Sequence, residues 1–321
     1  LGLKNATTTK VELGLDFKLP NNKRLSLLAY RDRTPNGFGN LTDYFVYQSN
    51  VYTQAQGLDI NPGAQTTIDF GNPARTDLVF MTTGRVGNTN TTVNKGVEMN
   101  FDFGEVRPLR TSFILSGAYS ETKTWSTDLN SASVRSSLLP TSYTAYGLTP
   151  FKVVYPTATD YNTYRRFSNA LQAVTHIPEL RMVASFTAQA IWYNYSISFV
   201  GHKTPIGYID TNLAYREITP DMMGGYLDMQ GTYYETRPTG VTSVAINDLR
   251  ADIGQNVPTK SPVTWNLSAR LTKELGTIGG LSLYVNNALF YEPFLPTNVS
   301  KTLTQRNTGN FSYGIELYLN L

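Results

Sequence analysis

Apolar and polar residues alternate strictly along several segments of the chain. In residues 10–20, Val11 and Leu13 fall on one side of an extended backbone, while Glu12 and Asp16 fall on the other. Because successive side chains of a β-strand point to opposite faces, this pattern predicts a strand with one apolar and one polar face. Clear or weaker alternation of this kind predicts nine strands: 10–20, 24–33, 93–103, 112–120, 164–176, 181–192, 263–272, 281–287 and 311–321.

Short and long connections between these segments alternate along the chain. Short turns with residues such as Pro, Asn and Gly join the strands in pairs at 20–23, 104–109, 177–180 and 274–280. The other connections are long, rich in Gly, Pro, Asn, Thr and Tyr, and without a helical period: about 34–90, 126–160, 200–261 and 292–307. Such long connections are unusual within a compact soluble domain, but they are regular on the extracellular side of a transmembrane β-barrel.

Two architectures share this alternation. In a soluble sandwich or lectin-like barrel the apolar faces pack inward, whereas in a membrane barrel they meet lipid. The longer segments reach the roughly 9 to 11 residues of a tilted spanning strand. Aromatic residues also gather near the strand ends, Tyr119, Trp192 and Trp265 toward one rim and Phe17 and Phe103 toward the other. These aromatic girdles favour the membrane barrel over the sandwich.

The composition excludes several other classes of protein. The formal net charge is only +3, which argues against nucleic acid as a partner, since phosphate binding needs a clustered basic surplus. With 0 Cys and 2 His, a disulfide framework, a structural zinc cage and a cysteine nucleophile are excluded. Charged residues are only 16% of the chain, yet no stretch is long and apolar enough for a spanning helix. A strand with one lipid-facing side explains both observations.

Few residues have the spacing that catalysis or metal binding needs. Glu12 and Asp16 share a strand face, but four residues along a strand span about 13 Å, beyond the roughly 5 to 9.5 Å of a glycosidase pair. His176 and Glu179 have a metal-like spacing in a short turn, where no helix brings them onto one face. We therefore expect no catalytic residue, no metal site and no cofactor.

The number of strands also bears on the organisation of the protein. Single-chain bacterial barrels have an even number of strands, and in lipid every sheet edge must be closed. Nine strands leave two edges open. We therefore expect residues 1–321 to be the C-terminal part of one larger barrel domain, with the remaining strands supplied by a segment that precedes Leu1.

Three stretches resemble TonB-dependent outer-membrane receptors. They are Asn-Lys-Gly-Val-Glu at 94–98, the run 281–290 with its Leu-Tyr-Val-Asn-Asn core, and Phe-Ser-Tyr-Gly-Ile-Glu-Leu at 311–317. In that family these motifs open a strand, begin the last hairpin and close a plugged barrel of about 22 strands. The resemblance extends over essentially the whole chain. It implies an all-β, transmembrane antiparallel barrel of which this chain supplies about nine strands, without the plug.

The resemblance implies an active importer in the bacterial outer membrane, and no enzyme. The cargo would be an organic nutrient: a glycan, peptide, siderophore or vitamin. Implied partners are the N-terminal barrel strands and plug of the same receptor, the TonB complex acting through that part, outer-membrane lipid and a surface lipoprotein. A passive porin or a surface adhesin barrel is the alternative, and a soluble carbohydrate-binding β-domain is a third.

Tyrosines of the long connections are the candidate ligand-binding residues. A tyrosine offers a flat apolar ring and a hydroxyl group, which suits stacking on sugars or gripping siderophores and peptides. Alternatively, the same rings pack the loops against one another. The candidates are Tyr44, Tyr47, Tyr208, Tyr215, Arg216, Tyr226, Tyr233 and Tyr234.

Overall fold

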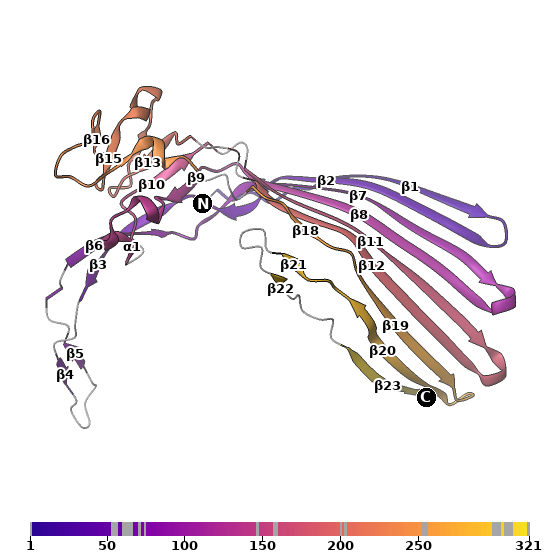
Figure 1. Cartoon of the computed structure of the whole chain (residues 1–321). Helices are drawn as coiled ribbons and strands as arrows, with labels where there is room; N and C mark the ends of the chain where they lie inside the picture. Colours follow the sequence, from indigo (N-terminus) through magenta and orange to yellow (C-terminus); the bar gives the residue numbers. More distant parts are fainter. Residues whose placement is uncertain are drawn as a thin grey trace.

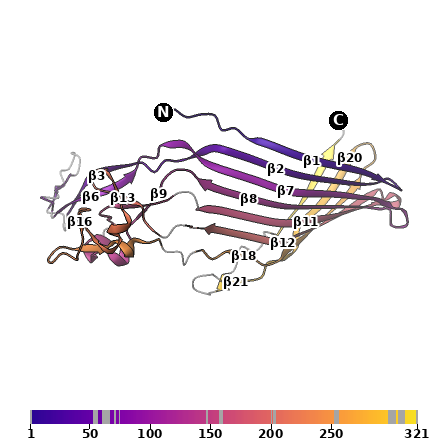
Figure 2. The same cartoon turned by 90° about the horizontal axis from the view of Figure 1, so that it is seen from above.

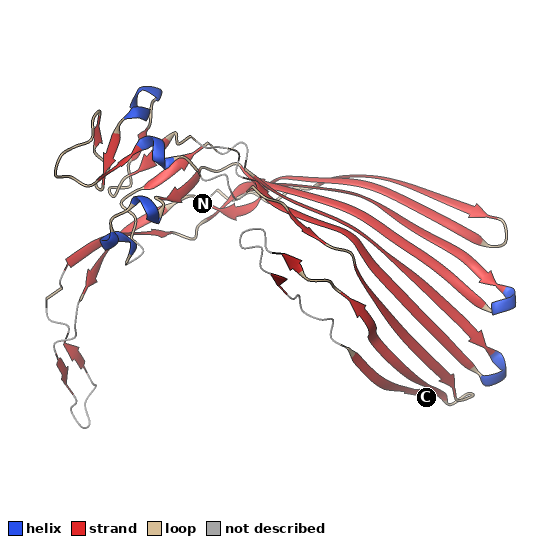
Figure 3. Cartoon of the chain, in the orientation of Figure 1, coloured by secondary structure: helices blue, strands red, loops and turns tan. Residues whose placement is uncertain are grey.

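The computed structural model confirms that the chain is all-β and antiparallel, with 64% strand and 8% helix. The structure describes residues 2–52, 57–59, 67–69, 72–73, 75–145, 148–156, 160–199, 201, 204–251, 256–296, 303–304 and 311–319. The helical segments are single short turns in the loops and at the tight turns (Figure 3). They are η1 Arg107–Leu109, η2 Ser136–Leu138, α1 Thr141–Thr144, η3 Pro178–Leu180, η4 Pro220–Gly224 and η5 Ile246–Leu249.

One large sheet dominates the molecule (Figure 1). Its path is β1-β2-β7-β8-β11-β12-β19-β20-β23, in sequence order, and every pairing along it is antiparallel. The strands are β1 Thr9–Leu19, β2 Lys23–Asn40, β7 Val86–Val106, β8 Thr111–Ser126, β11 Tyr161–Ile177, β12 Met182–Phe199, β19 Thr264–Glu274, β20 Gly279–Tyr291 and β23 Ser312–Leu319.

A tenth strand, β18 (Thr259–Ser261), pairs with β12 beside this path. The sequence pattern predicts a loop for these residues, because a strand of three residues is too short to show alternation. The sheet is open: β1 and β23 are its edges, and no ladder joins them in the described part of the chain. Seen from above (Figure 2), β20 runs at a steep angle to β1 and β2, so the sheet curls strongly.

The tight turns all lie at one end of the sheet, together with the C-terminus, and the long connections lie at the other (Figure 1). Local chemistry makes the turns tight. Asn21 and Asn22, in the three-residue loop between the paired residues Leu19 and Lys23, both have positive φ, 61° and 57°, a conformation that Asn tolerates well. Arg110 and Arg181 each adopt the left-handed conformation directly after a 3-10 turn.

Several strands are longer than the alternation predicts, β2 and β7 most of all. β2 continues to Asn40 and β7 begins at Val86, so their ladder reaches from Arg24 paired with Asp102 to Asn40 paired with Val86. The added segment pairs polar residues such as Thr34 with Thr92. Because this segment is polar on both faces, the sequence shows no alternation of apolar and polar residues there, although the hydrogen-bonded pairing of β2 with β7 continues.

The long connections also carry small sheets where the sequence analysis expected no regular structure (Figure 1). The first contains two hairpins, and two others combine into one sheet of order β14-β13-β10-β9 with a second sheet, β16-β15-β17, beside it. The strands are β3 Tyr44–Val51, β4 Gly57–Asp59, β5 Thr67–Asp69, β6 Arg75–Thr82, β9 Asn130–Ser133, β10 Lys152–Tyr155, β13 Gly207–Ile209, β14 Tyr215–Glu217, β15 Tyr226–Asp228, β16 Tyr233–Tyr234, β17 Ser243–Ala245, β21 Leu295–Pro296 and β22 Leu303–Thr304.

The packed core lies in these connections and not in the large sheet. We call residues 127–156 and 204–251 the loop domain. Its centre contains Phe151, Leu227 and Ile246, all at 0% exposure. None of the buried hydrophobic residues that the structure describes belongs to the large sheet. The sheet and the loop domain therefore satisfy their apolar residues in different ways.

Candidate functional site

The register of the large sheet brings the alternating apolar residues of its strands onto one face. Leu15 pairs with Leu27, which pairs with Met99, and the same row continues across the sheet to Trp265. We call this side the apolar face. Its side chains are unusually exposed: Leu13 is 65% exposed and Ile315 is 70% exposed.

No described part of the chain covers the apolar face. A soluble sandwich would bury such a face against a second sheet, and burying each large apolar side chain is worth roughly 1.5 to 3 kcal/mol. Here the loop domain has its own core, and the apolar face is left without a second layer among the described residues. Among those residues, no helix has the length and hydrophobicity to cross a membrane.

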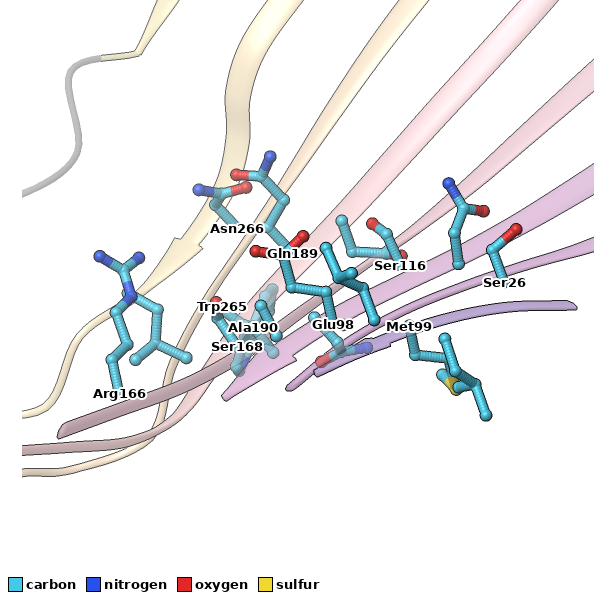
Figure 4. A pocket seen from close by; sticks show the side chains of 18 of the residues that line it. Ser26, Glu98, Met99, Ser116, Arg166, Ser168, Gln189, Ala190, Trp265 and Asn266 are labelled. Carbon is cyan, nitrogen blue, oxygen red and sulfur yellow. The ribbon is translucent and has the colours of Figure 1, made fainter. Parts of the chain in front are cut away.

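The opposite face of the sheet is polar and hollowed. Its central hollow, of about 710 Å³, extends over strands from β1 to β20. Figure 4 shows Glu98, Arg166, Gln189 and Asn266 among the side chains that line it. We call this side the polar face. Its lining combines hydroxyl, amide and charged groups, which suits contact with water and hydrophilic solutes.

Ion pairs hold several charges of the polar face in place. Arg24 lies 3.4 Å from Asp16, which also accepts a hydrogen bond from Ser26. Arg270 lies 2.7 Å from Glu316 on the more C-terminal strands. These pairs are exposed to solvent, which weakens the attraction between their charges. They distribute both signs of charge along the face.

Two hairpins of the loop domain have nearly the same structure and contain most of the candidate tyrosines. In the first, β13 pairs with β14; in the second, β15 pairs with β16. Gly207 lies against the ring of Tyr215, where an added Cβ would be 2.5 Å from the ring, and Gly225 lies in the same way against Tyr233, at 2.4 Å. Glycine is required at both positions because the rings occupy the space of a side chain.

A buried aspartate organises the turn of each hairpin. Asp210 accepts hydrogen bonds from the backbone N–H groups of Asn212 and Ala214, both 2.9 Å, and from Arg216 at 3.2 Å. Asp228 does the same in the second hairpin: it accepts from the backbone N–H groups of Gln230 and Thr232 and from the hydroxyl of Tyr234. Both aspartates are 5% exposed, so these bonds satisfy carboxylates that are shielded from water.

This duplication was missed by the sequence analysis, although the chain contains a signal for it. Residues 207–217 read Gly-Tyr-Ile-Asp followed by Tyr-Arg-Glu, and residues 225–235 read Gly-Tyr-Leu-Asp followed by Tyr-Tyr-Glu, at identical spacing. The motif is shorter than the repeats that define solenoid folds.

The structure separates the candidate tyrosines into buried and exposed ones. Tyr208 is only 4% exposed, packs against Phe151 at 5.5 Å between ring centroids, and donates its hydroxyl to the carbonyl of Gly231. It belongs to the core of the loop domain and not to its surface. Tyr215 is 49% exposed, although its hydroxyl donates to the carbonyl of Ile206 at 3.1 Å.

The remaining candidates lie in different places. Tyr226 and Tyr233 are half-buried on neighbouring positions of β15 and β16, and Arg216 is an exposed partner of Asp210. Tyr44 lies edge-on to Phe80 at 6.1 Å, near the loop domain, while Tyr47 is 42% exposed on the β3–β6 hairpin. The structure thus leaves Tyr215 and Tyr47 as the most accessible of the seven predicted tyrosines.

Burial shifts the pKa of several loop-domain groups, among them Tyr155 and Lys152. Burial raises the pKa of Tyr155, whose hydroxyl donates to the carbonyl of Leu249 at 2.6 Å. Burial also lowers the pKa of Lys152, whose ammonium group donates to Ser133 at 2.8 Å. No group of three or more acidic, His or Cys side chains suited to a metal ion occurs in the part of the chain that the structure describes.

Comparison of the chain with protein-family models, with curated proteins and with solved structures gives no match.

Proposed function

We propose that this chain is the C-terminal wall of a β-barrel of the TonB-dependent type, which imports an organic nutrient across the bacterial outer membrane. The observation that carries the proposal is the apolar face, exposed on every strand of the large sheet from Leu13 on β1 to Ile315 on β23. In a bilayer this face meets acyl chains, and the hollowed polar face lines the lumen. The long connections then lie on the extracellular side.

Strand lengths and open edges support this assignment. The strands of the path have 8 to 21 residues, whereas about 9 to 11 residues cross a bilayer. The edges β1 and β23 present backbone groups that lipid cannot satisfy. In the proposed barrel, about 22 strands in all, the N-terminal strands of the receptor pair with these edges. Two of the motifs that resemble the family fall within β7 and β20, and the third begins one residue before β23.

In this proposal the chain contributes a wall and part of a binding surface, without bond-making chemistry. A glycan, peptide, siderophore or vitamin is captured by the extracellular loops, with Tyr215 and Tyr47 as exposed aromatic contacts. The plug, the TonB complex and a surface lipoprotein are the proposed partners for passage and capture. Tyr208 supports the loop domain from within.

Spin labels on adjacent residues test the membrane orientation. The chain has 0 Cys, so Val97→Cys and Glu98→Cys each introduce a single labelling site into this part of the protein. Val97 lies on the apolar face and Glu98 on the polar face. In reconstituted protein we expect the label at 97 to be accessible to oxygen dissolved in lipid, and the label at 98 to a water-soluble nickel chelate. Equal access of the chelate to both labels contradicts the proposal.

Uptake measurements then test the transport step. Cells that lack the gene are expected to lose growth on one nutrient of the four proposed classes, and a tonB deletion should have the same effect. Tyr215→Ala should reduce binding of that nutrient, with Leu213→Ala, a 44% exposed residue of the same hairpin, as the control. Uptake that continues without TonB would instead indicate a passive porin.

A further inference from the structure

Five cations lie on the apolar face, toward its loop end. The row Ala29, Val97, Tyr119 and Phe167 is followed, two residues closer to the loops, by the row Arg31, Lys95, Glu121 and Arg165. The next row adds Arg33 and Lys123. All these side chains belong to the four adjacent strands β2, β7, β8 and β11 (Figure 1). We call the set Arg31, Arg33, Lys95, Lys123 and Arg165 the cation row.

The carboxylates nearby do not neutralise the cation row. Glu121 is held between Lys95 at 3.0 Å and Arg165 at 2.7 Å, and its side chain is only 14% exposed. Asp160 also borders the site, but it accepts hydrogen bonds from Asn130 and from the backbone N–H of Gly201. Five cations therefore share two carboxylates that already have partners.

Like charges face one another in this row. Arg31 is directly opposite Lys95 in the β2–β7 ladder, an arrangement that is unfavourable unless an anion lies between them. Within the described residues, Arg31, Arg33 and Lys123 have no ion-pair partner. The charge pattern is thus incomplete without an external anion.

A hollow of about 920 Å³ lies over the cation row. Arg31, Lys95 and Lys123 line it together with Trp125 and Phe199. Lys123 lies 3.9 Å from the centroid of the Tyr161 ring, and Arg165 lies 5.3 Å from that of Tyr195. The aromatic rings orient the cations and provide apolar surface beside them. The site combines positive charge with a direct continuation into the apolar face.

We propose that the cation row binds the phosphate groups of a multiply acylated glycolipid in the outer leaflet, with its acyl chains along the apolar face below. This inference rests on the proposed function, which places the face in lipid and the loops outside. Phosphate oxygens match guanidinium and ammonium donors, and the apolar rows next to the cations accept acyl chains. A soluble phosphate compound would use the charges but not the adjacent apolar rows.

Lipid binding to the purified full-length protein in detergent tests the inference. The probes are the phosphorylated glycolipid, the same lipid with its phosphates removed, and inorganic phosphate, measured by native mass spectrometry and by titration. We expect Arg31→Ala/Lys95→Ala/Lys123→Ala to bind the phosphorylated lipid roughly 100-fold more weakly. Arg166→Ala is the matched control, because Arg166 follows Arg165 but lies on the polar face.

Several outcomes would overturn the inference. They are equal binding by the triple variant and the wild type, equal binding of the dephosphorylated lipid, and binding of inorganic phosphate as tight as that of the lipid. If the triple variant does not fold, Lys123→Arg should retain binding and Lys123→Gln should weaken it; equal binding by these two contradicts the inference. Spin labels at 97 and 98 that respond as proposed, together with no lipid binding, would reject this site alone and leave the transporter proposal intact.

Discussion

Replacing Ala188 by Arg measures directly whether lipid covers the apolar face. Ala188 lies on β12 between Leu171 and Leu267 in the register of the sheet. Its strand begins at Met182, beside the tight turn. At about 3.3 Å per residue the separation along the strand is about 20 Å, and a tilt near 40° makes this roughly 15 Å of height within an apolar band about 25 Å tall. Ala188 is therefore close to the proposed bilayer midplane.

An arginine at the midplane of a β-barrel destabilises it by about 2 to 4 kcal/mol, because lipid cannot solvate the charge. Gln189→Arg is the matched control: Gln189 is the next residue, equally exposed, on the polar face. A charge at a solvated surface changes stability by about 0.5 kcal/mol or less. The free energies of unfolding are measured by urea titration of protein folded into lipid vesicles. A difference between the two variants below about 1 kcal/mol would refute the lipid-facing assignment, since the two faces would then meet the same solvent.

Further predictions concern the loop domain. Tyr155→Phe removes the hydrogen bond to Leu249 and should destabilise the loop domain by about 1 kcal/mol, measured by thermal melting followed by near-UV circular dichroism. Burial raises the folded-state pKa of Tyr155, so the stability that its neutral hydroxyl contributes should be fully present below the ordinary pKa of 10.0 and should be lost as the pH rises through the raised value. A loss of this stability on acidification would contradict the prediction. Gly225→Ala, whose Cβ would lie 2.4 Å from the Tyr233 ring, should cost about 1 to 3 kcal/mol. Gly224→Ala, with nothing within 4 Å of its Cβ, should be neutral, and equal effects of the two would show that the ring contact is unimportant.

Local patterns predicted the strands of the large sheet because alternation is a property of neighbouring residues. The segment 10–20 became β1, and the segment 181–192 became most of β12. The tight turns followed from equally local chemistry, as at Asn21 and Asn22. Polar extensions such as Val86 to Thr92 on β7 were missed, since their ladder depends on the partner strand and leaves no alternating signal.

The candidate site was only partly predictable. Tyrosine side chains suggested a ligand surface, but burial of Tyr208 against Phe151 depends on contact between two connections distant in sequence. The hairpin duplication around Asp210 and Asp228 was present in the residues and needed only a search at short spacing. The cation row was not predictable, because its members come from four strands and their alignment depends on register.

The all-β, antiparallel class and the polar and apolar sides of the longer strands follow from local sequence alone, because a two-residue period acts within each strand. Tertiary structure decided which residues of different strands share a row, which tyrosines are buried, and that two distant connections share one core. The physical reason is that register and packing are set by partners far along the chain, and a shift of one residue would exchange the two faces.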